Sequence, residues 1–174
     1  EMCIRDRGYD VIAKAPTGTG KTCAFGIPVA EHILPENKYP QAVIMAPTRE
    51  LAQQIAQELE ELTYFMPEVQ VACVYGGANM EKQAKRLAEG CQIVVATPGR
   101  LMDHYKHHSI DLAHVTQVVL DEADEMLNMG FYKDVRHIIE LMKARKSLSM
   151  FSATISREVM DIGWLYQNLS LIHI

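Results

Sequence analysis

The sequence predicts an α/β domain built on a mostly parallel β-sheet with helices on both faces. Short apolar runs rich in Val, Ile or Met alternate with longer segments of helical periodicity along nearly the whole chain. The runs show little polar alternation, which is typical of parallel strands buried on both faces. A length of 174 residues suits one domain, and an apolar fraction of 48% is enough for a core.

Each apolar run is a candidate strand. The expected strands lie at Asp10–Lys14, Gln41–Met45, Val69–Val74, Gln92–Ala96, Thr116–Leu120 and Ser147–Phe151. Parallel strands are joined by long crossover connections, usually helices, of a single right hand. The runs therefore predict repeated strand–helix–strand units.

Helical patterns fill the segments between these strands. In Arg49–Leu62 the apolar side chains fall on one stripe, as in a helix with one buried face. Met80–Ala88 and Arg136–Met142 carry weaker forms of this pattern. Ser156 is typical of a helix N-cap, and Glu158 stands in the first turn of the helix that would follow.

Composition excludes several classes of protein. The net charge of −5 gives no global attraction to nucleic acid, so any such contact must come from a local site. No apolar run is long enough for a membrane helix, and no signal-peptide pattern opens the chain. The cysteines, with no CxxC pair, are typical of reduced thiols in a cytoplasmic protein; they are Cys3, Cys23, Cys73 and Cys91.

Two histidines, His104 and His108, have the i, i+4 spacing of a shared helix face. A metal site would need further ligands nearby. The pair is therefore interpreted as part of a solvated helix face rather than as a metal site.

The two ends of the chain differ from the patterned sequence between them. Glu1–Arg7 and Leu169–Ile174 can be encoded by nucleotide words that are largely reverse complements of each other. The words resemble the transposon end used in sequencing-library adapters; chance similarity is the alternative. We expect both ends to be translated adapter, which leaves residues 8–168 as a truncated domain.

A short polar or glycine-rich segment follows every expected strand. The segments are 15–22, 46–51, 75–77, 96–100, 121–124 and 152–154. In open α/β sheets, ligands bind beyond the carboxyl ends of the strands. Because the carboxyl ends of parallel strands share one edge, the segments together predict one site.

The first segment resembles a phosphate-binding loop between a strand and a helix. Glycines let backbone N–H groups wrap phosphate oxygens, and the helix start favours negative charge. Lys21 would reach the β- and γ-phosphates, and the Thr22 hydroxyl would ligate Mg²⁺. A glycine-rich turn without nucleotide is the alternative. The expected ATP-binding residues are Ala15, Pro16, Thr17, Gly18, Thr19, Gly20, Lys21 and Thr22.

An acidic turn, residues 121–124, follows the fifth strand. At a strand end, Asp121 would hold Mg²⁺ largely through water, and Glu122 would polarise the attacking water. An acidic tetrapeptide alone is more often a helix start. Together with Lys21, the turn predicts phosphoryl-transfer chemistry with ATP and Mg²⁺.

The segments APTGTGKT, PTRELA, GG, TPGR, DEAD and SAT occur in an order that resembles the DEAD-box RNA helicase family. The resemblance covers Gly8 to Asn168 and is closest to a bacterial first domain. It implies a RecA-like P-loop NTPase fold and an ATP-dependent RNA helicase, with Lys21, Asp121 and Glu122 as the catalytic residues.

The resemblance also assigns roles beyond the ATP site. Asp124, Ser152 and Thr154 would couple ATP to RNA and to a second domain. The residues expected along the RNA path are Pro47, Thr48, Arg49, Gly77, Thr97, Gly99 and Arg100. Glycine amides, hydroxyls and arginines suit contacts with phosphate and sugar rather than base edges. Read without the resemblance, Arg49 and Arg100 are typical of helix-start or surface charges, and residues 152–154 of a polar turn.

Parts of the resembled family find no counterpart in the 174 residues. These parts are an adenine-reading segment with a glutamine, and a second RecA-like domain that carries arginine fingers and half of the RNA surface. We therefore expect the isolated chain to lack unwinding activity. Two other functions stay open: another P-loop motor such as a DNA helicase, and a nucleotide- or RNA-binding fragment without catalysis.

Overall fold

A computed structural model describes residues 10–14 and 20–167. Six strands form one sheet in the order β1–β6–β5–β2–β4–β3, and every neighbouring pair is parallel. The strands are β1 (Val11–Lys14), β2 (Ala42–Met45), β3 (Val71–Val74), β4 (Ile93–Ala96), β5 (Gln117–Leu120) and β6 (Ser147–Ser152). The parallel α/β fold is thus confirmed. The two end segments expected to be adapter lie outside the described residues.

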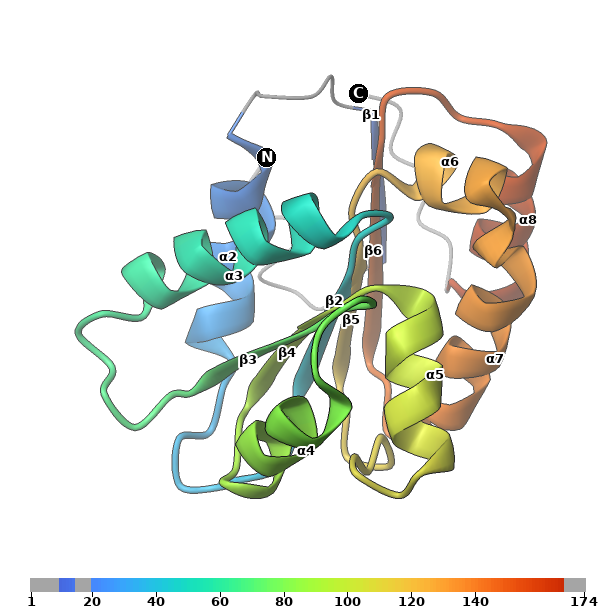
Figure 1. The fold of residues 1–174 in the computed structure, drawn as a ribbon. Helices are drawn as coiled ribbons and strands as arrows, with labels where there is room; N and C mark the ends of the chain where they lie inside the picture. The colour runs from blue at the N-terminus through green and yellow to red at the C-terminus, as the bar shows by residue number, and fades with distance from the viewer. Residues whose placement is uncertain (1–9, 15–19, 168–174) are drawn as a thin grey trace.

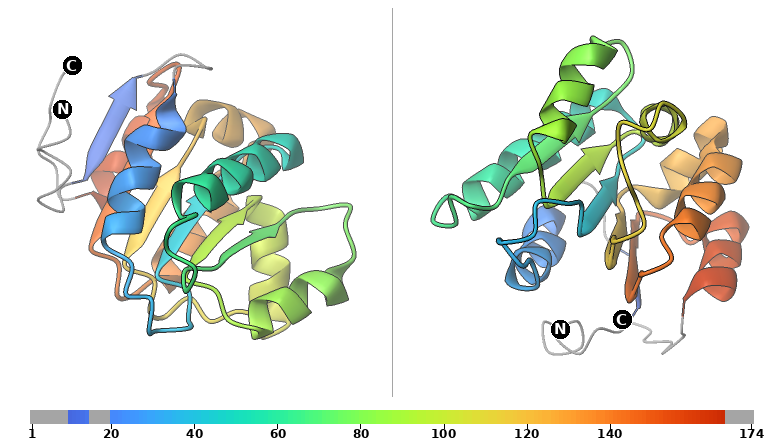
Figure 2. Two further views of the ribbon diagram at one scale, coloured as in Figure 1. Left: turned by 90° about the vertical axis from the view of Figure 1, so that its left-hand side faces the viewer. Right: turned by 90° about the horizontal axis from the view of Figure 1, so that it is seen from below.

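Helices cover both faces of the sheet (Figure 1, Figure 2). They are α2 (Lys21–Glu31), α3 (Arg49–Leu62), α4 (Met80–Ala88), α5 (Pro98–Lys106), α6 (Ala123–Met126), α7 (Tyr132–Leu141) and α8 (Arg157–Tyr166), with a π-helical turn η1 (Leu127–Phe131) between α6 and α7. Helices α2 and α3 pack on one face, and the apolar side chains of α4 to α8 pack on the other.

The sheet lies between two apolar cores, which explains why its strands are apolar throughout. In β2, Val43 and Met45 join the core beneath α5 and α7, whereas Ala42 and Ile44 join the core beneath α2 and α3. All four side chains are fully buried. A strand with helices on both sides has no solvent face, so polar alternation is absent.

Most of the predicted elements agree with the structure to within two residues. The helices at Arg49–Leu62 and Met80–Ala88 have the predicted bounds, and the Ser156 hydroxyl accepts a hydrogen bond from the Val159 N–H at 3.3 Å, as an N-cap does. The expected start of the helix at Arg136 is wrong. Helix α7 begins at Tyr132. The apolar pattern did not indicate its first turn, because that turn is mostly polar and only the later turns carry the apolar stripe.

The described cysteines form no disulfide with one another. Cys23 is exposed, Cys73 is half-buried and Cys91 is buried. Burial, with a smaller contribution from Glu60, raises the pKa of Cys73 to about 12, and burial raises that of Cys91 to about 11 against the opposing charge of Arg86. These two thiols are therefore neutral near pH 7. Within the described residues, no helix combines the length and apolar character that crossing a membrane requires.

Candidate nucleotide and RNA site

The strand order sorts the six predicted segments into two groups along the carboxyl edge of the sheet. In the first group, residues 20–22, 121–124 and 153–154 follow β1, β5 and β6, and Ser152 ends β6. In the second group, residues 46–51, 75–77 and 97–100 follow β2, β3 and β4, and Ala96 ends β4. The segments expected to bind ATP and those expected to line the RNA path thus occupy adjacent halves of one edge. Residues 15–19 of the expected phosphate loop lie outside the described residues.

Lys21 and Asp121 meet where the first group converges. The Lys21 Nζ lies 3.3 Å from the Asp121 Oδ1, and both side chains are more than nine-tenths buried. Within the described residues, this buried ammonium has no hydrogen-bond partner beyond the ion pair. Burial raises the pKa of Asp121, although the Lys21 charge opposes the rise. A cation and a carboxylate are therefore held out of water at the start of α2 and the end of β5.

This pair fits a magnesium–triphosphate group. Among the described residues, no hydrogen-bond acceptor beyond Asp121 reaches the buried ammonium, and phosphate oxygens would supply such acceptors. Thr22 is also buried, one residue into α2, and Gly20 before the helix has a φ of 72° with no side-chain cap. Mg²⁺ usually keeps several waters and takes one or two carboxylates plus substrate phosphates. Asp121 and Thr22 offer that sparse ligand set.

Glu122 occupies an unusual backbone position directly after Asp121. Its φ of 50° and ψ of 50° place it in the left-handed region, which side chains other than glycine seldom adopt. Its N–H donates to the Asp121 Oδ1 at 3.0 Å. The sharp turn leaves Asp121 buried and Glu122 half-buried. Two neighbouring acids thus have different environments at one strand end, and strain of this kind gathers at functional sites.

Asp124 joins the acidic turn to the turn after β6. Its Oδ2 accepts hydrogen bonds from the Thr154 N–H at 2.8 Å and the Thr154 hydroxyl at 2.6 Å. Its own N–H donates to the Ser152 hydroxyl oxygen, and the Ser152 O–H donates to the Thr154 carbonyl. Burial acts to raise the pKa of Asp124, but the hydrogen bonds from Thr154 and Ser152 outweigh it and lower that pKa. The three predicted coupling residues therefore form one network.

The Thr154→Val variant should unfold more easily than wild type by about 1–2 kcal/mol, because it loses the hydroxyl bond to a carboxylate but keeps the N–H bond. Urea unfolding of the 174-residue chain near pH 7 measures this. Thr154→Ser keeps the hydroxyl and serves as the control.

The contribution of this network to stability depends on pH. Because the pKa of Asp124 is lowered in the folded protein, the network stabilises the fold above the ordinary aspartate pKa of about 3.9 and loses this effect as the pH falls further. Equal stability of both variants at neutral pH would contradict the assignment.

The second group is built on two helix starts. Thr48 caps α3, since its hydroxyl accepts the Leu51 N–H at 3.3 Å. The neighbouring Arg49 is exposed, with its guanidinium 5.6 Å from the Tyr75 ring centroid. Pro47 is buried before the cap. Arg49 is thus an exposed charge at the first position of α3.

Arg100 is not the surface charge that the isolated pattern indicated. Only 13% of its side chain is exposed, and its Nη1 donates to the Ala78 carbonyl at 3.0 Å and to the Gln83 Oε1 at 3.2 Å. Gly77, with a φ of 81°, precedes Ala78 in the same turn, and Thr97 anchors α5 by donating its N–H to the Val74 carbonyl at 3.1 Å. Arg100 thus ties the start of α5 to the glycine turn after β3.

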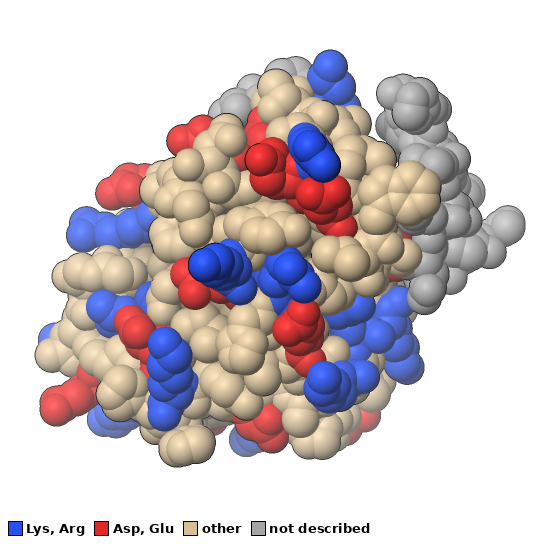
Figure 3. Space-filling view, turned by 90° about the vertical axis from the view of Figure 1, so that its right-hand side faces the viewer, with Lys and Arg blue, Asp and Glu red and all other residues tan. Residues whose placement is uncertain are grey.

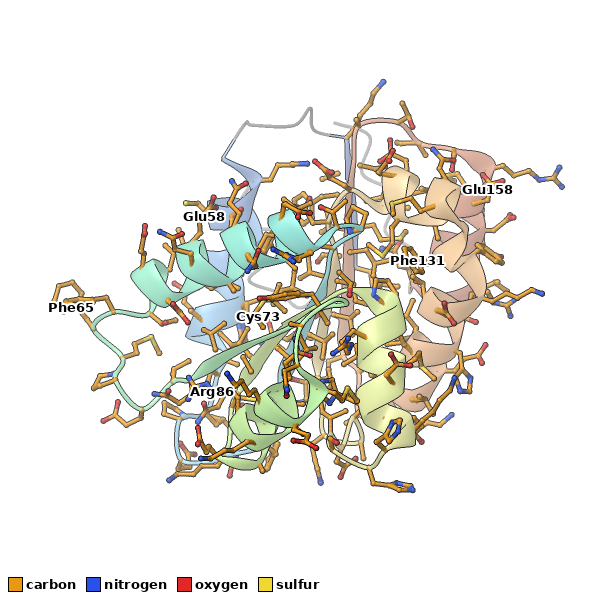
Figure 4. All side chains as sticks on the ribbon, viewed as in Figure 1. Glu58, Phe65, Cys73, Arg86, Phe131 and Glu158 are labelled. Carbon is orange, nitrogen blue, oxygen red and sulfur yellow. The ribbon has the colours of Figure 1, made fainter. Side chains whose placement is uncertain are left out.

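Gly99 connects this group with the segment that follows the acidic turn. A Cβ added at Gly99 would lie 3.8 Å from the Phe131 ring. Figure 4 labels Phe131 beside the start of α5, where η1 passes that helix. The start of α5 therefore lies close to Phe131, the last residue of η1.

The interpretation of His104 and His108 as a solvated helix face is wrong. His104 is fully buried, with its Nε2 3.1 Å from the Gln83 Oε1, whereas α5 ends at Lys106, before His108. Burial and the nearby Arg100 lower the pKa of His104. In the described part of the chain no group of three potential metal-binding side chains forms. Gln83 was not predicted as a site residue, because a glutamine in an amphipathic helix carries no signal of burial.

A parallel sheet that places a Gly-Lys-Thr helix start beside an acidic turn defines a RecA-like P-loop domain. The chain belongs to the DEAD/DEAH box helicase family, whose model matches residues 2–162.

Known proteins resemble this chain along most of its length. It is 49% identical over 156 residues to the ATP-dependent RNA helicase CshA of Limosilactobacillus reuteri, covering 90% of this chain and 31% of that protein. It is 44% identical over 155 residues to the ATP-dependent RNA helicase DeaD of Escherichia coli K12, covering 89% and 25%. The crystal structure of a DEAD box protein from Methanococcus jannaschii superposes with a TM-score of 0.87 at 39% identity, covering 96% and 46%. The chain thus spans less than a third of either curated relative.

Proposed function

We propose that this chain is the first RecA-like domain of a cytoplasmic ATP-dependent RNA helicase that uses ATP to remodel or unwind RNA. The observation that carries the proposal is the buried pair of Lys21 and Asp121 at the carboxyl edge of the sheet. Family membership and the named activities of CshA and DeaD support it. A second RecA-like domain would be needed to complete the enzyme.

In the proposed site, residues 15–22 cradle the triphosphate and Lys21 neutralises its β- and γ-phosphates. Asp121, with Thr22, holds Mg²⁺ largely through water. The metal, when bound, neutralises charge on the phosphate oxygens. Glu122 accepts the proton of the attacking water. Phosphoryl transfer mainly needs positioning and charge neutralisation, which these side chains supply.

RNA would bind along the other half of the edge, through Pro47, Thr48, Arg49, Gly77, Thr97, Gly99 and Arg100. Backbone amides at glycines, hydroxyls and guanidinium groups recognise phosphate and sugar, so little sequence preference follows. Figure 3 shows positive and negative side chains interspersed on the face that it displays, with no broad basic field. Binding by a local row of donors fits an acidic protein better than attraction by overall charge.

Hydrogen-bonded turns and a strand pair connect the proposed ATP-binding half of the sheet edge with the proposed RNA-binding half, and they would couple ATP to RNA. The network of Asp124, Ser152 and Thr154 joins the turns after β5 and β6, and β5 pairs with β2, whose turn begins the RNA half. A change at the γ-phosphate would therefore reach the RNA residues through hydrogen-bonded turns and one strand pair. A competition assay between RNA and DNA of equal sequence separates this function from that of a DNA helicase; preference for DNA would contradict it.

Lys21→Ala in the full-length helicase should weaken Mg²⁺–ATP binding about tenfold or more, because charge-assisted contacts contribute about 1.5–3 kcal/mol each. Equilibrium titration with a fluorescent ATP analogue measures the change. Lys106→Ala, at the exposed end of α5, is the matched control and should bind as wild type does. Unchanged affinity in Lys21→Ala would remove residues 15–22 from the phosphate site.

A further inference from the structure

Gln83 is the centre of a buried polar network beneath the proposed RNA residues. Its Nε2 donates to the Tyr75 carbonyl at 3.1 Å. Its Oε1 lies 3.2 Å from the Arg100 Nη1 and 3.1 Å from the His104 Nε2. Both Gln83 and His104 are buried, so water does not satisfy these groups in their place.

The chemistry of the partners allows only one arrangement of this network. A carbonyl only accepts hydrogen bonds, so the Gln83 amide nitrogen must face Tyr75 and its oxygen must face the other two groups. A guanidinium only donates, and His104 must therefore present an Nε2–H to the same oxygen. The His104 Nδ1 is buried without a hydrogen-bond partner among the described residues, which fits a neutral ring.

This arrangement fixes one edge of the Arg100 guanidinium. Its Nη1 is committed to Gln83 and to the Ala78 carbonyl, and its Nε lies 3.9 Å from the exposed Asp103. In the described part of the chain, Nη2 makes no hydrogen bond, which leaves its donors for a ligand. A side chain ordered before binding loses less conformational entropy when it binds.

We propose that Gln83 and His104 are positioning residues that hold Arg100 ready for an RNA phosphate. The inference rests on the proposed RNA role of Arg100. Gln83 comes from α4 and His104 from α5, so the network also fixes the start of α5 against the glycine turn through Tyr75 and Ala78. RNA therefore meets an arginine whose direction is set by two side chains that do not touch the RNA.

A double-mutant cycle in the full-length helicase tests this. The affinity for single-stranded RNA is measured with a non-hydrolysable ATP analogue for Gln83→Met, Arg100→Ala and the double variant. We expect Arg100→Ala to bind about tenfold or more weakly, since a charge-assisted contact is lost. Gln83→Met keeps the side-chain length and the Arg100 charge, and should bind about two- to tenfold more weakly. The double variant should bind no more weakly than Arg100→Ala, because Gln83 acts through that arginine.

His104→Phe provides a second variant that keeps a ring but loses the Nε2–H; it should weaken RNA binding in the same direction and should also have no further effect after Arg100→Ala. Gln54→Met is the matched control, because Gln54 is exposed on α3 and its Nε2 donates to Glu58 of the same helix. Thermal unfolding confirms that each variant is folded before its affinity is compared.

The outcomes separate the two ideas. Wild-type RNA affinity in Arg100→Ala would overturn the RNA role of Arg100 and the positioning role with it. Weaker binding by Arg100→Ala together with silent Gln83→Met and His104→Phe variants would overturn the positioning role alone. Multiplicative losses in the double variant would also overturn it, since a purely structural contribution of Gln83 would not depend on Arg100.

Discussion

Glu122→Gln in the full-length helicase should bind Mg²⁺–ATP as wild type does and hydrolyse it about 10²–10⁴ times more slowly. The substitution keeps the shape of the side chain but removes its ability to accept a proton from water. Asp121, rather than Glu122, forms the buried pair with Lys21, so the proposed metal ligand stays in place. Glu122 already adopts a left-handed backbone conformation as a non-glycine residue, and glutamine can adopt the same conformation at a similar cost in free energy.

Equilibrium nucleotide binding and single-turnover hydrolysis, measured on the same preparation, test both halves of this expectation. Glu125→Gln is the matched control, because Glu125 is exposed on α6 and should leave both quantities unchanged. Normal hydrolysis by Glu122→Gln would remove Glu122 from the catalytic role. Loss of nucleotide binding would instead place it among the groups that hold the phosphate or the metal.

The 174-residue chain by itself should not unwind an RNA duplex, and RNA should hardly stimulate its ATPase activity. The transition state of phosphoryl transfer spreads negative charge over the γ-phosphate, and an arginine supplied to it contributes about 10³–10⁵ in rate. In the resembled family that arginine comes from the second RecA-like domain, and the chain spans only 31% of its CshA relative. Coupling between the ATP and RNA sites would also need both domains to close on one RNA strand.

Strand displacement and phosphate release, each with and without single-stranded RNA, measure this directly. The full-length helicase is the positive control, and the chain mixed with a separately produced second domain tests whether activity is restored. Nucleotide titration of the same samples distinguishes a binding-competent fragment from an unfolded one. Robust RNA-dependent turnover by the chain alone would contradict the proposed division of labour between two domains.

The strands could be predicted because a strand that is buried on both faces is apolar at every position, and this pattern can be recognised without knowing which strands are its neighbours. Ala42–Met45 is apolar at each position and is sandwiched between two cores. Strand order leaves no such local signal. Nothing near β1 indicates that its neighbour is β6 or that β2 lies between β4 and β5. The separation of the proposed ATP and RNA residues into halves of one edge therefore emerged only from the structure.

The proximity of Lys21 and Asp121 could be predicted, because both residues follow expected parallel strands whose carboxyl ends share one edge of the sheet. Lys21 and Asp121 were expected to share a phosphate site, and the structure places them 3.3 Å apart. Gln83, His104 and the burial of Arg100 were missed. A polar residue in an amphipathic helix has the same local pattern whether it faces water or a buried partner, and only tertiary packing distinguishes the two.

The order of strands in the chain also has a consequence for synthesis on the ribosome. Strands β2, β3 and β4 follow one another in the chain and are neighbours in the sheet, so the RNA half can assemble from a continuous stretch. Among the described strands, β1 pairs only with β6, so Val11 can pair with Ser149 only after β6 has been synthesised. Long-range pairs of this kind form late, because the intervening chain must first be ordered. A nascent chain would thus carry most of the proposed RNA-binding residues while the proposed nucleotide site is still incomplete, and it would bind ATP only after β6 has left the exit tunnel.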